Sequence, residues 1–113
     1  MPKIKYGFAH TMKKDKRYPL WMKQQKERGF DETELWSLFF TISQFILPRL
    51  KAFKANPFGY PGSLTSETWD KKLQEMIDGF EAIERDNIGN DEDYKIVKKG
   101  LDTFREYFLD LWN

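Results

Sequence analysis

A chain of 113 residues is long enough for one domain with a modest core and too short for a second independent domain. Charged residues make up 33% of it and aromatic residues 17%, a balance that excludes a disordered chain. Because there is no cysteine and no apolar run near the roughly 20 residues of a membrane span, a disulfide framework and a membrane helix are excluded. The N-terminus has no apolar leader region, so we expect the protein in the cytoplasm.

The net charge of +1 conceals a basic N-terminal part and an acidic C-terminal part. Residues 1–28 hold nine lysines and arginines against two acids, whereas residues 65–113 hold thirteen acids against seven basic residues. The simplest interpretation is that the basic segment lies on acidic helices of its own chain or of a second copy. An alternative is that this segment binds nucleic acid, since aromatic residues alternate with its basic ones.

The first elements are an arm and two helices. Residues 1–18 lack a regular period and are predicted to form an extended basic arm, followed by a single helical domain over residues 19–113. A short helix is expected to begin at Pro19, a residue suited to the first helical position, and to stop at Gly29. The central helix is predicted over Asp31–Lys54, with Asp31 as its N-cap.

The central helix is apolar on more than one side, which exceeds the single stripe that an outer helix needs. We therefore expect it in the middle of the fold, covered by other helices or by a second subunit. Pro48 cannot donate to the carbonyl of Gln44, so a bend is expected near Leu47. The apolar residues are Leu35, Trp36, Leu38, Phe39, Phe40, Ile42, Phe45, Ile46, Leu47, Leu50 and Phe53.

Two amphipathic helices follow a turn-rich loop at residues 56–63. Thr65 is the predicted N-cap of the third helix, whose apolar stripe consists of Trp69, Leu73, Met76, Ile77, Phe80 and Ile83. After a loop at residues 87–90, the fourth helix is predicted over Asp91–Trp112, with a stripe of Tyr94, Val97, Leu101, Phe104, Phe108 and Leu111. The fold class is therefore all-α, a small helical bundle of three main helices plus the short N-terminal helix and the basic arm.

Four short strings stand out between residues 29 and 113, namely FILPRLK, GYPG, TWD and GFE. Together they resemble a family of small proteins encoded by tailed bacteriophages. No activity is assigned to this family, so the resemblance implies a viral origin and action in the host cell cytosol, but no reaction. Relatives often carry an acidic residue in place of Phe39 and a glutamate in place of Thr68. The first departure argues against a polar site on that face, and the second removes the glutamate of a capping box.

Cationic and aromatic residues gather around the end of the central helix and the loop after it. A nucleotide or another anionic ligand could stack on such rings and pair with the cations. Asp70 borders the stripe of the third helix, where Arg105 of the fourth helix could meet it. The predicted ligand-binding residues are Arg49, Lys54, Tyr60, Trp69, Asp70 and Arg105. The plainer interpretation is that the cations only cap a helix end.

The third helix also offers an enzymatic alternative. Glu75 with Asp78, and Glu81 with Glu84, have the acidic spacing by which all-α nucleoside triphosphate pyrophosphohydrolases hold Mg²⁺. The sequence contains no nucleophile with a recognisable base and no glycine-rich phosphate loop, so we predict no catalytic residue, metal or cofactor. Its only histidine, His10, lies in the arm, which excludes the paired motifs of a di-iron bundle.

We therefore expect a non-enzymatic accessory protein of a phage that acts by binding, for example against host defence. It would block a host protein or sequester a small anionic ligand such as a signalling nucleotide. A homodimer or larger oligomer is expected, because the aromatic surplus exceeds what one small core can hide. The alternatives are Mg²⁺-dependent nucleotide hydrolysis and nucleic-acid binding through the arm, and no membrane partner is expected.

Overall fold

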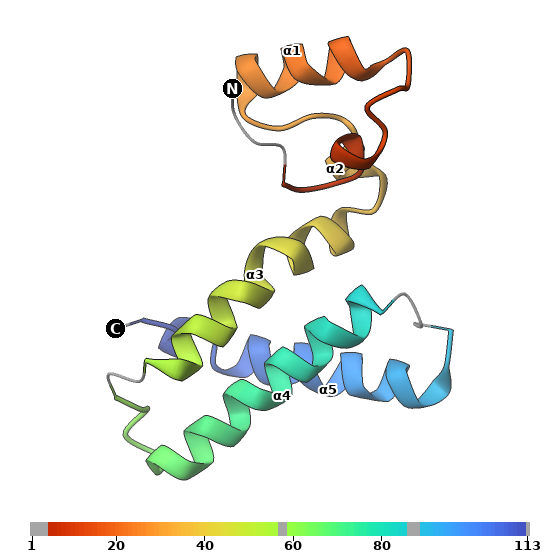
Figure 1. The fold of residues 1–113 in the computed structure, drawn as a ribbon. Coiled ribbons are helices and arrows are strands. Elements are labelled where there is room, and N and C mark those ends of the chain that lie inside the picture. The colour runs from red at the N-terminus through yellow and green to blue at the C-terminus, as the bar shows by residue number, and fades with distance from the viewer. Residues whose placement is uncertain (1–4, 57–58, 86–88, 113) are drawn as a thin grey trace. The chain divides into compact units, whose positions relative to one another are not determined.

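The computed structural model of the protein describes residues 5–56, 59–85 and 89–112. Within these residues every regular element is helical, which confirms the all-α prediction (Figure 1). The chain divides into two compact units, Met1–Phe45 and Ile46–Asn113, and helix α3 (Leu38–Ala55) contributes turns to both. The division thus falls inside a helix, whereas the sequence predicted a boundary after residue 18.

The first unit contains the 3₁₀ helix η1 (Ala9–Thr11), α1 (Tyr18–Arg28), α2 (Thr33–Trp36) and the first turns of α3. Helix α1 lies where the sequence predicted a short helix. It has its proline in the first turn and ends at Gly29, whose φ of 82° is a left-handed conformation that glycine adopts without strain.

The helix predicted over Asp31–Lys54 is in fact two helices, because the chain leaves the helical conformation at Ser37 (φ −134°, ψ 75°). The backbone N–H groups of Phe40 and Thr41 both donate to the carbonyl of Ser37, which therefore begins α3 as an N-cap does. The hydroxyl of Thr41 donates to the carbonyl of Glu34 at 2.7 Å. This bond gives a partner to the carbonyl of Glu34, one of the carbonyl groups that have no acceptor role within α2 because the helix ends.

Helix α3 has one mostly buried face. Its most buried residues, Ser43, Leu47 and Leu50, form one narrow face, and Phe39 and Ile42 are about half exposed. We predicted that other helices or a second subunit cover this segment, and this stays a prediction. Within the first unit, the ring of Phe8 stacks on that of Phe40 at 5.8 Å, so the N-terminal segment packs on the first turns of α3. Pro48 does not interrupt the helix, which continues to Ala55.

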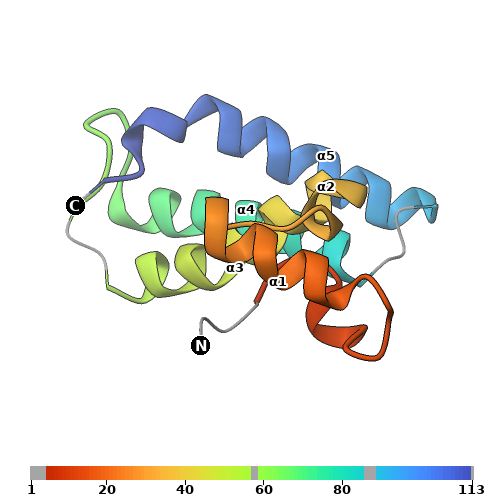
Figure 2. The same ribbon diagram turned by 90° about the horizontal axis from the view of Figure 1, so that it is seen from above.

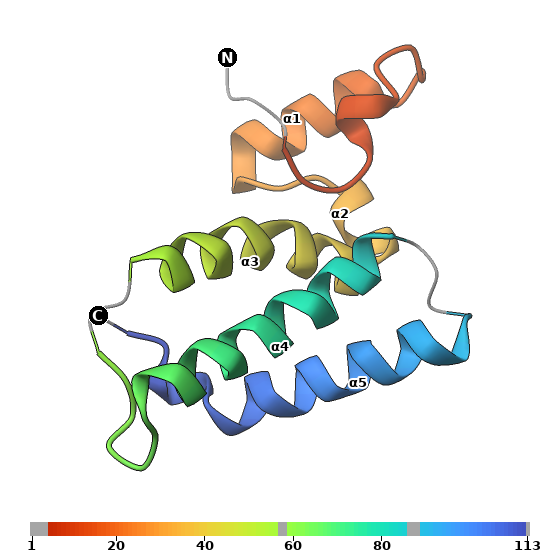
Figure 3. The same cartoon turned by 60° about the horizontal axis from the view of Figure 1, so that its bottom comes forward.

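The second unit contains the last turns of α3, α4 (Ser66–Glu84), α5 (Asp91–Glu106) and the 3₁₀ helix η2 (Phe108–Asp110). The hydroxyl of Thr65 accepts from the N–H of Thr68 at 3.1 Å, which confirms the predicted N-cap of α4. The side chain of Asn90 caps α5 in the same way. Helices α4 and α5 lie side by side (Figures 2 and 3).

The apolar stripes predicted for the last two helices, α4 and α5, agree with the buried faces to different extents. All six stripe residues of α4 are buried. On α5 the buried face is Val97, Gly100 and Thr103, while Leu101 and Tyr94 of the predicted stripe are largely exposed. The stripe predicted for α5 is therefore correct at Val97 and at Phe104, whose ring meets that of Phe80 edge to face at 5.3 Å, and wrong at Tyr94 and Leu101.

A close approach between two glycines explains the orientation of α5. A Cβ atom on Gly100 would lie 2.7 Å from the Cα of Gly79 on α4 and 2.8 Å from the carbonyl oxygen of Glu75. The two backbones can meet here only because neither residue has a side chain. Helix α5 then ends at Glu106, earlier than the predicted Trp112. The predicted loops at residues 56–63 and 87–90 lie partly outside the described residues.

Candidate ligand-binding cavity

The second unit contains a cavity of about 310 Å³ at the end of α3 and the start of α4. This volume lies at the lower end of the range of roughly 300–1,000 Å³ found for small-molecule sites. The residues that line it are Lys54, Gly59, Tyr60, Ser66, Trp69, Asp70 and Leu73. Among the described residues, the lining therefore combines aromatic walls with one cation and one anion.

Three elements position the lining side chains. Lys54 is in the last turn of α3, Tyr60 comes from the loop that follows, and Trp69 and Leu73 are one turn apart on α4. The ring of Trp69 is buried and meets that of Tyr107 edge to face, with 5.6 Å between the ring centroids. Trp69 is thus a fixed wall of the cavity, whereas Tyr60 is exposed on the loop.

The charged groups of the cavity pair with each other. The Nζ atom of Lys54 lies 3.3 Å from Oδ1 of Asp70, and the lysine side chain is the more buried partner of the two. An exposed pair of this kind contributes little to folding stability, about 0.2–1 kcal/mol. A ligand that offers Lys54 a better acceptor can therefore displace Asp70 at small cost.

The structure brings together Lys54, Tyr60, Trp69 and Asp70, four of the six residues that the sequence singled out. Arg49 and Arg105 do not line the cavity. The carboxylate of Asp70 pairs with Lys54 of α3, and not with Arg105 as the sequence suggested. Gly59, Ser66 and Leu73 also line the cavity and were not among the predicted residues. Leu73 could have been found, since it follows Trp69 by four residues on the same helical face.

The acidic residues of α4 do not gather into one site. Glu75 accepts from the hydroxyl of Thr103 at 2.8 Å, Asp78 accepts from the side chain of Gln74, and Glu81 lies 2.8 Å from the Nζ atom of Lys51. In residues 5–56, 59–85 and 89–112 no group of three or more acidic, histidine or cysteine side chains could hold a metal ion. The spacing of Glu75, Asp78, Glu81 and Glu84 therefore does not produce a magnesium centre in the described part of the chain.

The ion pair of Lys51 on α3 with Glu81 on α4 also affects pKa values in its surroundings. The hydrogen bond to Glu81, together with the charge of that carboxylate, raises the pKa of Lys51. Burial raises the pKa of Glu84, and the positive charge of Lys51 opposes that shift. Lys51 with Glu81 and Lys54 with Asp70 are thus two ion pairs between α3 and α4, of which the second lines the cavity.

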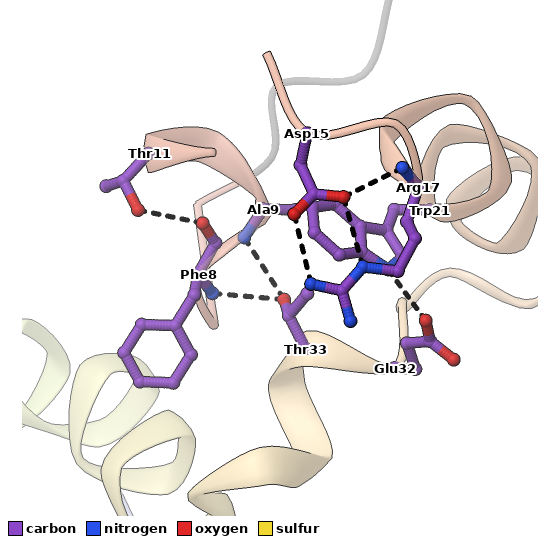
Figure 4. Close-up of polar contacts among 8 residues, drawn as sticks. All are labelled: Phe8, Ala9, Thr11, Asp15, Arg17, Trp21, Glu32 and Thr33. Atoms are coloured by element: carbon purple, nitrogen blue, oxygen red, sulfur yellow. Dashed lines mark hydrogen bonds and ion pairs between the residues drawn. The ribbon is translucent and has the colours of Figure 1, made fainter. Parts of the chain in front are cut away.

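The basic N-terminal segment is tied to the first unit. The N–H groups of Phe8 and Ala9 both donate to the hydroxyl of Thr33, at 3.0 and 3.1 Å (Figure 4). The N–H of Gly7 donates to the side chain of Gln44 at 2.8 Å. The segment predicted as an extended arm is therefore hydrogen bonded to α2 and α3 over these residues.

Arg17 forms a second anchor in the same segment. Its guanidinium pairs with the carboxylate of Asp15 and lies over the rings of Trp21 and Trp36, 5.2 and 5.3 Å from their centroids. The indole N–H of Trp21 donates to Glu32 at 2.8 Å (Figure 4). Hydrogen bonds from Arg17 lower the pKa of Asp15 to about 2. One of the basic residues that the nucleic-acid hypothesis relies on is thus engaged within its own unit.

Comparison with known proteins identifies no relative of the chain. No protein-family model, curated protein or solved structure matches the chain. Among the described helices, none has the length and apolar character needed to cross a membrane. The functional inference therefore depends on the chemistry of the cavity.

Proposed function

We propose that the protein is a non-enzymatic accessory protein that sequesters a small anionic ligand, of the size of a single nucleotide, in the cavity at the start of α4. The supporting observation is that Lys54, Tyr60, Trp69 and Asp70 line this one cavity. The resemblance of the sequence to small phage proteins supports a signalling nucleotide of the infected cell as the ligand.

The proposed binding mode follows from the lining residues. A planar base lies against Tyr60 and Trp69, where aromatic contact and apolar burial favour it. The phosphate accepts a charge-assisted hydrogen bond from Lys54. To make this bond, Lys54 gives up its ion pair with Asp70. Asp70 thus competes with the ligand for Lys54. The volume of about 310 Å³ favours a mononucleotide over a larger dinucleotide.

The test is calorimetric titration with ribonucleoside monophosphates, cyclic mononucleotides and inorganic phosphate. Lys54→Met is expected to weaken binding roughly 10- to 100-fold, because a charge-assisted hydrogen bond contributes about 1.5–3 kcal/mol. Asp70→Asn is expected to strengthen binding by up to about 5-fold, since it removes a competitor that contributes at most about 1 kcal/mol. These two opposite effects identify an anionic ligand held by Lys54.

Lys71→Met is the matched control, because Lys71 is exposed on α4 and does not line the cavity. It removes the same charge and is expected to leave the affinity unchanged. Equal losses in Lys71→Met and Lys54→Met would show a general charge effect and contradict the proposal. So would weaker binding in Asp70→Asn, or no binding of any compound in the set.

A further inference from the structure

The acidic side chains of the first unit are mostly engaged within it. Residues 1–45 contain nine lysines and arginines against five acids. Asp31 and Glu34 are buried and accept hydrogen bonds from a glutamine of α1. Asp15 accepts from an arginine and Glu32 from a tryptophan of the same unit. Four of the five acids thus have a hydrogen-bond partner inside the first unit.

The lysines of this unit take little part in these contacts. In residues 5–45, the one ion pair made by a lysine joins Lys23 to Glu27 at 3.8 Å. Both side chains are more than 60% exposed, so the pair is weak and easily exchanged for another partner. Among the described residues, Lys13, Lys14 and Lys16 make no ion pair. The first unit therefore keeps its acids inside and leaves its lysines for an external anion.

The turn between η1 and α1 brings two of these lysines to a cavity. Residues 10–15 line this cavity, which has a volume of about 570 Å³ and includes Lys13 and Lys14. Asp15 also lines it, but the guanidinium of Arg17 donates to both of its carboxylate oxygens, at 3.0 Å each. The cavity thus offers two ammonium groups to an anion, and phosphate oxygens are suitable acceptors for them.

Further lysines follow along the chain. Lys16 comes directly before α1, and Lys23 and Lys26 lie on that helix. At about 100° per residue, Lys23 and Lys26 are about 60° apart around the helix and about 140–160° from Trp21. Because Trp21 is buried, the two lysines face away from the core of the first unit. Five lysines between residues 13 and 26 can therefore contact one extended anion.

The surroundings of the lysines favour nucleic acid over a bilayer or an acidic protein. A helix binds a bilayer through an apolar face, and a protein interface has an apolar centre. In residues 5–29 the one large apolar side chain that is exposed is Leu20, and Trp21 of α1 is fully buried. Nucleic acid needs no apolar contact, because the closely spaced charges of its phosphates supply the attraction.

The aromatic rings near these lysines are engaged in the packing of the first unit. The ring of Phe8 stacks on those of Trp36 and Phe40, with 6.2 and 5.8 Å between the centroids. Trp21 is buried and its indole N–H donates to Glu32. Rings packed in this way cannot serve as platforms on which bases stack. Phosphate contacts alone carry no information about base sequence.

From the engaged acids, the available lysines and the packed rings, we infer that the first unit binds the sugar–phosphate backbone of nucleic acid without sequence preference. The contacting residues are Lys13, Lys14, Lys16, Lys23 and Lys26. This activity is separate from the proposed ligand cavity, which lies in the second unit. Five phosphate contacts give a slope of about −4.5 for duplex and about −3.5 for single strands, in a plot of log association constant against log salt concentration.

Fluorescence anisotropy of the full chain with labelled DNA tests this inference between 50 and 200 mM KCl. The probes are two duplexes of different sequence and one single strand, each about 20 nucleotides long. The two duplexes are expected to bind equally well, with the slope given above. The double variant Lys13→Gln with Lys14→Gln is expected to bind duplex roughly 10- to 100-fold more weakly at 100 mM salt, with a slope smaller in magnitude by about 2.

The matched control is the double variant Lys71→Gln with Lys98→Gln, which removes the same charge from exposed positions of the second unit. It is expected to leave the slope unchanged. Equal changes in the two double variants would show a general charge effect and overturn the inference. Absence of binding at 50 mM salt would also overturn it, as would a strong preference for one duplex sequence. Tighter binding to phosphatidylserine vesicles or to polyglutamate than to DNA would reject nucleic acid as the partner.

Discussion

At the scale of single residues, the packing of the second unit depends on two positions that are glycine and so have no side chain. Gly79 and Gly100 let the backbones of α4 and α5 approach so closely that an added methyl group on Gly100 would lie 2.7 Å from a backbone atom. Backbone atoms cannot move aside as the end of a flexible side chain can. The same contact directs Thr103 toward Glu75, to which its hydroxyl donates.

We predict that Gly100→Ala lowers the free energy of unfolding by about 1–3 kcal/mol, the usual effect of overpacking a well-packed contact. The gain in helix propensity, about 1 kcal/mol, offsets only part of the loss. Urea denaturation measures the change. Gly62→Ala is the control, because a Cβ atom there meets nothing within 4 Å. Equal stability of the two variants would show that α5 can move away freely.

A second residue-scale prediction concerns Asp15, whose pKa falls from 3.8 to about 2 because Arg17 donates hydrogen bonds to it. Because the folded-state pKa lies below the unfolded value, the pair stabilises the folded chain above pH 3.8 and loses its effect as the pH falls toward 2. Titration of the carboxyl group by NMR should show this low pKa, and Arg17→Met should return it toward 3.8. Lys16→Met should change it little, since Lys16 makes the smallest contribution. An unchanged pKa in Arg17→Met would contradict the assigned cause.

At the scale of elements, α2 shows how a helix of one turn is held in place by side chains. The carboxylate of Asp31 accepts from the N–H and the hydroxyl of Thr33, and Glu34 accepts in return from the N–H of Asp31 at 2.9 Å. This reciprocal pattern is a capping box. The side chain of Gln25 on α1 donates to both carboxylates, so it joins α1 to the start of α2. The N-cap residue of α2 is Glu32, one position after the predicted Asp31, although it is the side chain of Asp31 that accepts from the N–H of Thr33 in the first turn.

Thr33 links this box to the N-terminal segment, and Thr33→Val tests the link. The change removes the acceptor of two backbone N–H groups, those of Phe8 and Ala9. We predict a loss of about 2–4 kcal/mol in the free energy of unfolding, since each unsatisfied buried group costs about 1–3 kcal/mol and water reaches part of the site. Hydrogen exchange at the two amides should accelerate strongly. Thr11→Val, at an exposed threonine of the same segment, is the control. It should leave the free energy of unfolding and the exchange rates of the two amides unchanged.

The elements that the sequence predicted best are those determined by local signals. The apolar spacing of α4, the cap at Thr65 and the stop at Gly29 all depend on residues within one or two turns. The orientation of α5 depends on Gly79, which is far away in sequence and belongs to another helix. No pattern along α5 alone contains that information. The bond between Gly7 and Gln44 likewise spans 37 positions, so the attached N-terminal segment looked like a free arm.

At the scale of the whole molecule, the cavity was predictable in part for a simple reason. Residues 56–65 join the end of α3 to the start of α4, so Lys54, Tyr60 and Trp69 come close wherever those two helix ends pack together. Arg105 lies on α5, which meets α4 at a contact between glycines that the apolar pattern did not reveal.

Because α3 belongs to both units, the protein cannot be dissected into two halves that keep their structure. Cutting the chain between Phe45 and Ile46 would split a continuous helix and expose four carbonyl groups on one fragment and four N–H groups on the other. Each fragment would also lose the helical turns that follow or precede the cut. Studies with isolated pieces would therefore report on frayed ends, and single substitutions in the intact chain are the sounder route.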